Sequence, residues 1–289
     1  MINSTAPIGV FDSGLGGLEI TSQIANAFPN ENLIYLGDTA RVPYGTRSPD
    51  RVKAYTIQAA DFLVNQGIKA LVIACNTASC YALKTLQERY SIPIFGMINP
   101  GVQAASLSKT GVLVLATSGT IRSQAYQHAL SHANSNRIVV PLACPLFVPL
   151  VETGWIDRPL TGEIIKEHLS CLMQPPFSTL NLNKIDLCLL GCTHYPLLKP
   201  FIHRALSYVL GRSVHIVDGG RALINHLKTR LHSSLSTTIS SPLPKYRFYT
   251  TDQSQSMIET AQRFWKTQNH IDLPPLTHIV LNDCHPKGI

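Results

Sequence analysis

The sequence predicts an α/β protein with two similar, doubly wound parallel-sheet domains, related by a pseudo-two-fold duplication, with an active site in the cleft between them. Short apolar runs alternate with helix-forming segments, which is typical of a parallel sheet covered by helices. Two of these runs, 71–74 and 185–191, each lead into a cysteine followed by small polar residues. A Gly-Val pair before an apolar run and a small polar turn also occurs twice, within 8–14 and 110–120. Because both landmarks recur in the same order, each domain is expected to offer one strand-end cysteine to the cleft.

The first series begins with a strand over 8–11 and a helix that starts near Leu18. The glycine-rich turn over 12–17 lacks the lysine and the spacing of a nucleotide-binding loop. It predicts a tight turn whose backbone N–H groups face an anion such as a carboxylate. Asp12 in this turn is either a helix N-cap or a site residue, and the sequence leaves both readings open.

A second strand, over 33–36, runs into the polar loop 37–45, a kind of segment that often carries function. The next helix is expected over 49–66. Ser48 is its expected N-cap, and Gly67 is expected just beyond its end.

Cys75 follows the apolar run 71–74 and precedes a helix expected to end near residue 90. Asn76 or Thr77 is expected to cap that helix. The cysteine then lies at the carboxyl end of a strand, where ligands bind in open α/β sheets. The helix dipole at this position favours a thiolate.

The rest of the chain continues the same alternation. Further strands are expected at 92–96, within 110–120, and at 138–140, 185–191, 214–217, 246–249 and 277–280. Further helices are expected at 159–172, 197–210 and 254–266. Residues 143–154 are expected to form a loop, and the Ser-, Thr- and Pro-rich stretch 232–244 a solvated linker.

Composition favours a globular protein of the cytoplasm. No apolar run is long enough to span a bilayer, and the N-terminus lacks the basic and apolar parts of a signal peptide. Seven irregularly spaced cysteines argue against a disulfide framework. The net charge of +7 comes from scattered basic residues, so a small anionic substrate is favoured over nucleic acid as the primary partner. No membrane partner is expected.

Four kinds of chemistry are open to Cys75 and Cys192. A disulfide is disfavoured in the cytoplasm. A zinc site needs about four ligands, and the two cysteines with His194 supply at most three, so no metal is expected. A hydrolase in which His194 activates Cys192 leaves Cys75 without a role. The fourth is a two-base proton exchange. The remaining cysteines are expected to be small core residues: Cys80, Cys144, Cys171, Cys188 and Cys284.

In a two-base exchange, one thiolate removes a proton from a substrate carbon and a thiol on the opposite face returns one, which inverts the stereocentre. The pKa of cysteine, about 8.5 when unperturbed, can be lowered toward neutrality for this task. Pseudo-symmetric cysteines suit a substrate and a product that are mirror images. Four groups are candidates to tune the thiols or relay protons: His194, Asp12, Asp38 and Glu152.

An ordered set of motifs across nearly the whole chain resembles glutamate racemases. The motifs are residues 12–17, 37–45, 75–79, 117–120, 145–152, 191–196 and 248–252. The resemblance implies a cofactor-independent enzyme that interconverts L- and D-glutamate and supplies D-glutamate for peptidoglycan. The chain departs from the family at Gly219, where a serine is usual, so no catalytic role is expected there.

The resemblance also implies a domain organisation and residue roles. The first domain would comprise residues 1–98 and 212–289, and the second 99–211. Cys75 would act on the D-enantiomer and Cys192 on the L-enantiomer. The residues expected to assist catalysis are Asp12, His194, Asp38 and Glu152. The residues expected to hold glutamate are Asp12, Ser13, Tyr44, Gly45, Asn76, Thr77, Thr117, Thr120, Thr193 and His194.

Other functions stay open. An aspartate or hydantoin racemase of the same superfamily would differ in pocket depth, which sequence spacing does not give. A cysteine hydrolase would need only Cys192 and His194, so it would survive the loss of Cys75. A binding protein on this fold would bind glutamate without turnover. Pyridoxal phosphate is not expected, because no lysine lies in a motif. The oligomeric state stays open; because the family often forms dimers, a homodimer is one candidate assembly.

Overall fold

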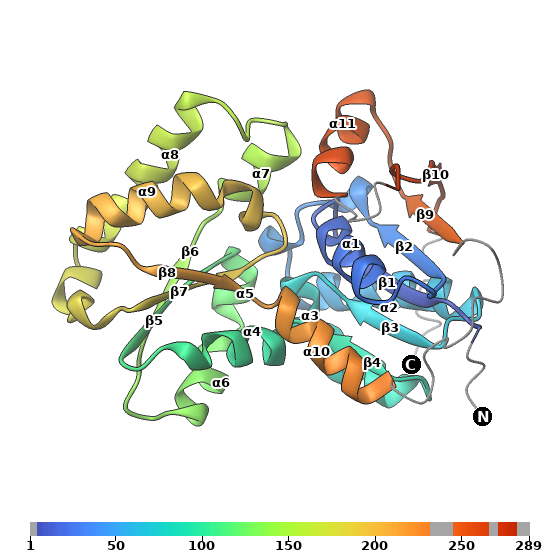
Figure 1. The fold of residues 1–289 in the computed structure, drawn as a ribbon, viewed down its shortest axis with the longest axis horizontal. Coiled ribbons are helices and arrows are strands. Elements are labelled where there is room, and N and C mark those ends of the chain that lie inside the picture. Colours follow the sequence, from blue (N-terminus) through green and yellow to red (C-terminus); the bar gives the residue numbers. More distant parts are fainter. Residues whose placement is uncertain (1–4, 232–244, 266–270, 282–289) are drawn as a thin grey trace.

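The structure, a computed structural model, describes residues 5–231, 245–265 and 271–281. Within these ranges it contains two parallel sheets, with strand orders β10-β9-β2-β1-β3-β4 and β6-β5-β7-β8. The sheets lie side by side and helices pack on both faces of each (Figure 1). This confirms the predicted α/β class with two doubly wound parallel sheets.

The elements alternate along the chain as the sequence predicts. The first sheet comprises β1 (Ile8–Asp12), β2 (Leu33–Gly37), β3 (Ala70–Ile73), β4 (Ile94–Gly96), β9 (Tyr246–Thr250) and β10 (Leu276–His278). The second comprises β5 (Gly111–Ala116), β6 (Ile138–Ala143), β7 (Leu187–Gly191) and β8 (His215–Asp218). The longer helices are α1 (Gly17–Ala27), α2 (Pro49–Asn65), α3 (Asn76–Arg89), α8 (Pro159–Ser170), α9 (Lys199–Leu210), α10 (Gly220–Leu231) and α11 (Gln255–Phe264). The shorter helices are α4 (Ile98–Ala104), α5 (Ser118–Arg122), α6 (Ala125–Ala133) and α7 (Phe147–Glu152).

The strand order of the second sheet repeats part of the first. The series β2-β1-β3-β4 corresponds to β6-β5-β7-β8, and all of these pairings are parallel. Cys75 lies two residues after Ile73, the last residue of β3, and Cys192 directly follows β7. The two cysteines therefore occupy equivalent strand ends, as an internal duplication predicts.

Side chains of the central strands fill cores on both faces of each sheet. In β1, Ile8 and Val10 join one buried cluster and Phe11 joins another on the opposite face. In β5, Leu113 and Val112 divide in the same way. Because both faces are covered by helices, these strands are continuous apolar runs rather than alternating ones.

One strand contradicts the domain boundary expected after residue 211. β8 lies beyond that boundary, yet it pairs with β7 in the second sheet. Residues 215–218 therefore belong with the 99–211 segment. The chain returns to the first sheet later, where β9 pairs with β2. The other domain limits stay a prediction.

Local signals placed the ends of α2. Ser48 accepts a hydrogen bond from the Arg51 N–H as its N-cap, and Gly67, just beyond its end, has a φ of 74°. Both predictions are confirmed.

Several helices were not expected. α4 contains Pro100 and Gly101, which disfavour a helix interior, and packing against α10 and β7 stabilises it. α7 occupies part of the segment 143–154 that was expected to be a loop, so that prediction was wrong. α6 and α10 have ordinary amphipathic patterns, so their signal was present in the sequence.

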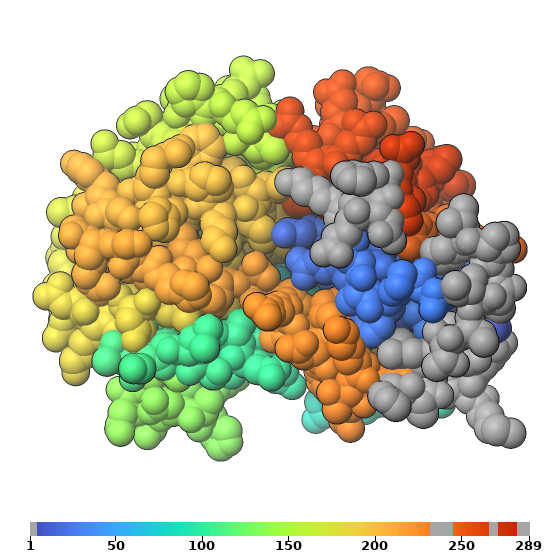
Figure 2. Space-filling view, in the orientation of Figure 1, coloured from blue at the N-terminus to red at the C-terminus, as the bar shows by residue number. Residues whose placement is uncertain are grey.

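The surface view shows how the two halves meet. On the face seen in Figure 2, α4 and α10 lie side by side across the junction. In the part of the chain that the structure describes, no helix is long and apolar enough to cross a bilayer. The expected linker 232–244 and Cys284 lie outside the described residues.

Candidate active site

Both predicted cysteines line one small cavity at the carboxyl ends of the strands. The cavity volume is about 20 Å³, room for about one water molecule. Loops that follow β1, β2, β3, β5 and β7 supply most of its walls, in agreement with the rule for ligand sites in open sheets. The lining residues are Ser13, Val42, Pro43, Tyr44, Gly45, Cys75, Asn76, Thr77, Thr117, Val148, Cys192, Thr193 and His194.

Cys75 is held as a neutral thiol. Burial, with a contribution from the Asp12 carboxylate, raises the pKa of the Cys75 thiol to about 12. The Ser13 hydroxyl, 3.3 Å from the sulfur, and the Ala78 N–H, 3.4 Å from it, oppose that rise. Cys75 is itself the N-cap of α3, so the expectation that Asn76 or Thr77 caps this helix was wrong. The sulfur accepts the N–H that an oxygen would normally accept.

Cys192 lies beside a histidine held in its protonated form. The sulfur is 3.8 Å from His194 Nδ1, and His194 Nε2 is 2.5 Å from Glu152 Oε1. Burial lowers the pKa of His194, but hydrogen bonds with Cys192 and Glu152 outweigh it and raise that pKa well above its usual value. A protonated imidazole beside a thiol favours the thiolate.

Asp12, at the end of β1, is fully buried and links the two halves of the molecule. Its carboxylate accepts hydrogen bonds from the Gly14 N–H at 3.0 Å and from the Thr193 hydroxyl at 3.3 Å. Burial raises its pKa, although the His194 charge opposes this. The N-cap interpretation of Asp12 is wrong, because Gly16 occupies the N-cap position of α1.

Asp38 lies behind the cavity wall. Its carboxylate accepts hydrogen bonds from the Tyr44 hydroxyl, from Arg41 Nε at 2.7 Å and from the Thr251 hydroxyl at 2.8 Å. Asp38 is fully buried and does not line the cavity, whereas Tyr44 does. It therefore acts on the site through Tyr44 rather than by direct contact.

Threonine hydroxyls join the two sheets across the cavity. Thr77, which follows β3, lies 2.7 Å from the Thr117 hydroxyl and 3.0 Å from that of Thr120, both of which follow β5. Gly45 permits this approach, because a Cβ there would lie 2.5 Å from Thr117 Cβ. These hydroxyls can bind a carboxylate that enters between them.

The predicted site residues fall into two groups: those that line the cavity and those that bond a lining residue. Those that line the cavity are Cys75, Cys192, Ser13, Tyr44, Gly45, Asn76, Thr77, Thr117, Thr193 and His194. The other four predicted residues each bond a lining residue: Asp12 to Thr193, Asp38 to Tyr44, Glu152 to His194 and Thr120 to Thr77. All fourteen are thus brought together.

Sequence reasoning missed several contributors. Val42, Pro43 and Val148 line the cavity, and the first two lie in the loop 37–45 that was expected to carry function. Tyr126 donates a hydrogen bond to Asn76 from α6, a helix that was not expected. Phe264 packs its ring edge-on against His194 from α11. No local pattern marks the last two.

Of the cysteines expected in the core, Cys144 and Cys188 are buried. Cys171 is partly exposed and packs against the core, and Cys80 is partly exposed. All six cysteines in the described ranges are free. Those ranges also contain no group of three or more His, Cys, Asp or Glu residues that could hold a metal ion.

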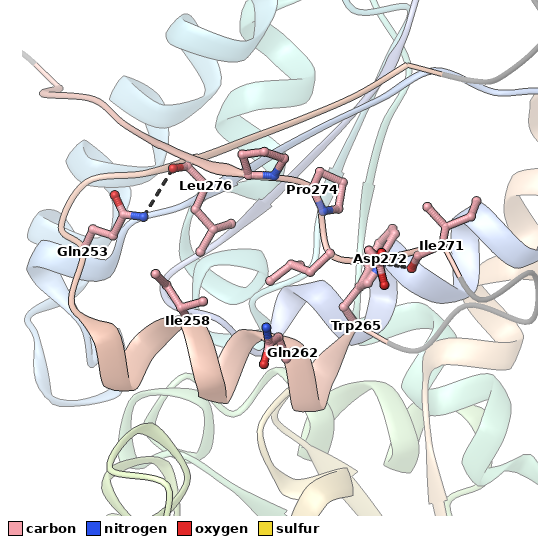
Figure 3. A pocket seen from close by; sticks show the side chains of 10 residues that line it. Gln253, Ile258, Gln262, Trp265, Ile271, Asp272, Pro274 and Leu276 are labelled. Carbon is pink, nitrogen blue, oxygen red and sulfur yellow. Dashed lines mark hydrogen bonds between the residues drawn. The ribbon is translucent and has the colours of Figure 1, made fainter.

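A larger pocket of about 850 Å³ lies between α11 and the segment 271–276 (Figure 3). Gln253 closes one end with a hydrogen bond of 3.3 Å to the Leu276 carbonyl. This pocket contains none of the predicted site residues and no cysteine. The larger pocket is therefore not the one that the two predicted cysteines line.

Comparisons with known proteins agree with this geometry. The Asp/Glu/Hydantoin racemase family model matches residues 8–227. The glutamate racemase of Geobacter metallireducens is 42% identical over 259 residues, covering 89% of this chain and 92% of the relative. That of Oceanobacillus iheyensis is 41% identical over 268 residues, covering 92% and 93%. The structure resembles glutamate racemase of Francisella tularensis in complex with D-glutamate, with a TM-score of 0.83, 34% identity, and coverage of 96% of this chain and 99% of that one.

Proposed function

The chain belongs to the Asp/Glu/hydantoin racemase family, and on this premise we infer that it acts as a glutamate racemase, interconverting L- and D-glutamate. This reaction supplies D-glutamate for peptidoglycan. The observation that carries the proposal is the pair Cys75 and Cys192, which line one cavity from equivalent strand ends. A cytoplasmic location agrees with the free cysteines. The homodimer and the independence from cofactors stay predictions.

We propose that Cys192 and Cys75 are the two bases. For L-glutamate, the Cys192 thiolate takes the Cα proton and leaves a carbanion that the α-carboxylate delocalises. The Cys75 thiol then gives its proton to the opposite face of Cα. The products are D-glutamate, a Cys192 thiol and a Cys75 thiolate, so protons and electrons balance. The reverse reaction exchanges the two roles.

The electrostatics of the cavity support this assignment. The mechanism needs a positive charge beside Cys192, and the protonated His194 supplies it, while burial and Asp12 raise the pKa of Cys75 and favour its thiol form. Glu152 supports this arrangement by holding the proton on His194.

Glutamate must open the cavity to enter. The cavity holds about 20 Å³, room for about one water molecule, so the facing loops must separate and then close on the substrate. On closure, polar groups of Ser13, Asn76, Thr77, Thr117 and Thr193 would hold its charged groups. Exclusion of water would strengthen their hydrogen bonds.

The test follows wild-type protein with L-glutamate in D2O, without added cofactor. Optical rotation and Cα deuterium are measured together. Rotation that decays to zero while the D-enantiomer gains deuterium supports the proposal. Exchange with aspartate but not glutamate would change the substrate assignment. No exchange with either, or racemisation that Cys75→Ala does not slow, would refute the two-thiol mechanism and favour a hydrolase or a binding protein.

A further inference from the structure

Tyr126, in the first turn of α6, contacts the residue before Cys192 and the residue after Cys75. Its ring lies against Gly191, the residue before Cys192, where a Cβ would come within 3.0 Å of Cε2. Its hydroxyl lies 2.6 Å from Oδ1 of Asn76, the residue after Cys75. The side chain is only 1% exposed. Tyr126 thus joins the second sheet to the segment that carries the first cysteine.

Two backbone features accommodate the Tyr126 side chain: a glycine that leaves space for it and a left-handed residue before it. Gly101 in α4 leaves space for the hydroxyl, since a Cβ there would lie 2.5 Å from it. Gln124, two residues before Tyr126, has a φ of 57°, which is uncommon for a residue other than glycine. This left-handed turn separates α5 from α6 and directs Tyr126 inward.

The hydrogen bond determines which way the Asn76 amide faces. A distance of 2.6 Å is usual for an O–H···O bond but shorter than an N–H···O bond, so the tyrosine donates and the amide oxygen accepts. The other acceptor within reach, the Met97 carbonyl, is farther, at 3.3 Å. The amide NH2 group is therefore turned away from Tyr126.

That NH2 group is available to the substrate. Asn76 is 5% exposed and lines the cavity, and its NH2 group donates to no residue in the described ranges. A donor that lines a cavity and has no protein partner can be satisfied by a ligand that enters the cavity. Carboxylate oxygens accept hydrogen bonds and do not donate them, so they match this group.

We propose that Tyr126 is a positioning residue for the racemisation: its hydroxyl fixes the Asn76 amide so that the NH2 group faces a carboxylate of glutamate. This inference rests on the proposed function. Without the hydroxyl, the amide can turn its oxygen toward the carboxylate, where two acceptors repel each other. Substrate binding is then weakened, while the two cysteines keep their places.

The experiment compares Tyr126→Phe, Asn76→Ala and the double variant in both reaction directions. Tyr126→Phe should raise KM about tenfold and change kcat by less than about threefold. A tenfold change in KM is the size expected when one buried hydrogen bond is lost. Asn76→Ala should raise KM by at least as much. In the Asn76→Ala background, Tyr126→Phe should add less than about twofold, because the group it positions is gone.

Tyr195→Phe is the matched control. Tyr195 is equally buried and its hydroxyl donates to the Cys144 carbonyl at 3.0 Å, away from Asn76. Both phenylalanine variants lose one buried hydroxyl, so their unfolding temperatures should fall alike, but only Tyr126→Phe should raise KM.

Three results would overturn the inference: a KM for Tyr126→Phe equal to that of Tyr195→Phe, the same effect of Tyr126→Phe with and without Asn76, or an unchanged KM for Asn76→Ala. All three leave wild-type racemisation intact. An inactive wild-type enzyme would instead refute the proposed function itself.

Discussion

Replacing Glu152 with glutamine should move the alkaline limb of the pH–activity profile to lower pH. Glu152 Oε1 lies 2.5 Å from His194 Nε2, and both side chains are largely buried. In the wild-type protein, burial lowers the pKa of His194, and hydrogen bonds with Cys192 and Glu152 more than restore it. Glutamine keeps the shape but removes the charge. Burial is then opposed by Cys192 and by a weaker hydrogen bond to a neutral amide, so the pKa of His194 must fall.

The size of the effect follows from that contact. A hydrogen bond to a charged group contributes about 1.5–3 kcal/mol. Since 1.36 kcal/mol corresponds to about one pKa unit, the pKa of His194 should fall by roughly 1–2 units. In the proposed mechanism the protonated His194 stabilises the Cys192 thiolate. The value of kcat/KM on the alkaline side should therefore fall roughly 10- to 100-fold.

The assay is kcat/KM for both enantiomers across the pH range, followed by optical rotation. L- and D-glutamate have equal free energies in water, so kcat/KM must be the same in both directions for every variant. A kcat/KM that differs between the two reaction directions would therefore reveal an assay error. The individual values of kcat and KM can still differ between the directions. Glu163→Gln, which removes a charge from the exposed surface of α8, should leave the profile unchanged. An alkaline limb that stays in place or moves up in Glu152→Gln would refute this reasoning.

The same pair should give stability a pH dependence. The pKa of His194 is higher in the folded protein than in the unfolded chain. Its contribution is therefore complete below about pH 6.5 and is lost as the pH rises through the folded-state pKa. In urea unfolding, Glu152→Gln should be less stable than wild type by about 1.5–3 kcal/mol near pH 6. The difference should shrink at alkaline pH, and a constant difference would contradict the ion pair.

Four further predictions concern the site. Cys75→Ala and Cys192→Ala should each slow racemisation roughly 10²–10⁴-fold. In D2O, Cys75→Ala should exchange the Cα proton of L-glutamate only, and Cys192→Ala that of D-glutamate only. The opposite pattern would show that Cys75 acts on L-glutamate and Cys192 on D-glutamate. Asp38→Asn should lower the free energy of unfolding by about 1.5–3 kcal/mol and reduce kcat little, because the carboxylate lies behind the wall and bonds Tyr44, which lines the cavity. A collapse of kcat at unchanged stability would instead make Asp38 an acid–base group. Gly16→Ala should lower kcat/KM at least about tenfold, because the added Cβ would lie 2.4 Å from the Thr193 hydroxyl and displace it. Unchanged kinetics would show that the 12–17 turn can move to accommodate the methyl group. Dialysis against a chelator, and separately addition of pyridoxal phosphate, should leave the rate unchanged, and a rate that depends on either would end the expectation of cofactor independence.

The sequence by itself determined the fold class and the pair of cysteines that we propose as the two bases. Strands buried on both faces must be continuous apolar runs, and these are visible without a structure. Cys75 and Cys192 each follow such a run, and parallel strands bring their carboxyl ends to one edge. The repeated order of landmarks then predicts that both thiols face one cleft, as they do.

The sequence was less informative at short helices and element boundaries. α4 carries proline and glycine inside a helix, so its local propensity is low and packing decides its conformation. β8 joins the second sheet although it follows the segment expected to close it. Pairing partners are chosen by the whole sheet, and a strand of four residues carries no mark of its neighbour.

Only the tertiary structure decided which polar residues touch the cavity and which act through another side chain. Asp38 and Glu152 are both acids in functional-looking segments, yet one bonds Tyr44 and the other His194. The contact of Tyr126 with Asn76 joins a helix that follows β5 to a helix that follows β3, so it links the two halves of the molecule. Such pairs are chosen by how loops pack across the cleft, and local sequence carries no signal of that packing. The raised pKa values of Cys75 and His194 depend on burial and on these contacts, so they too belong to the folded molecule.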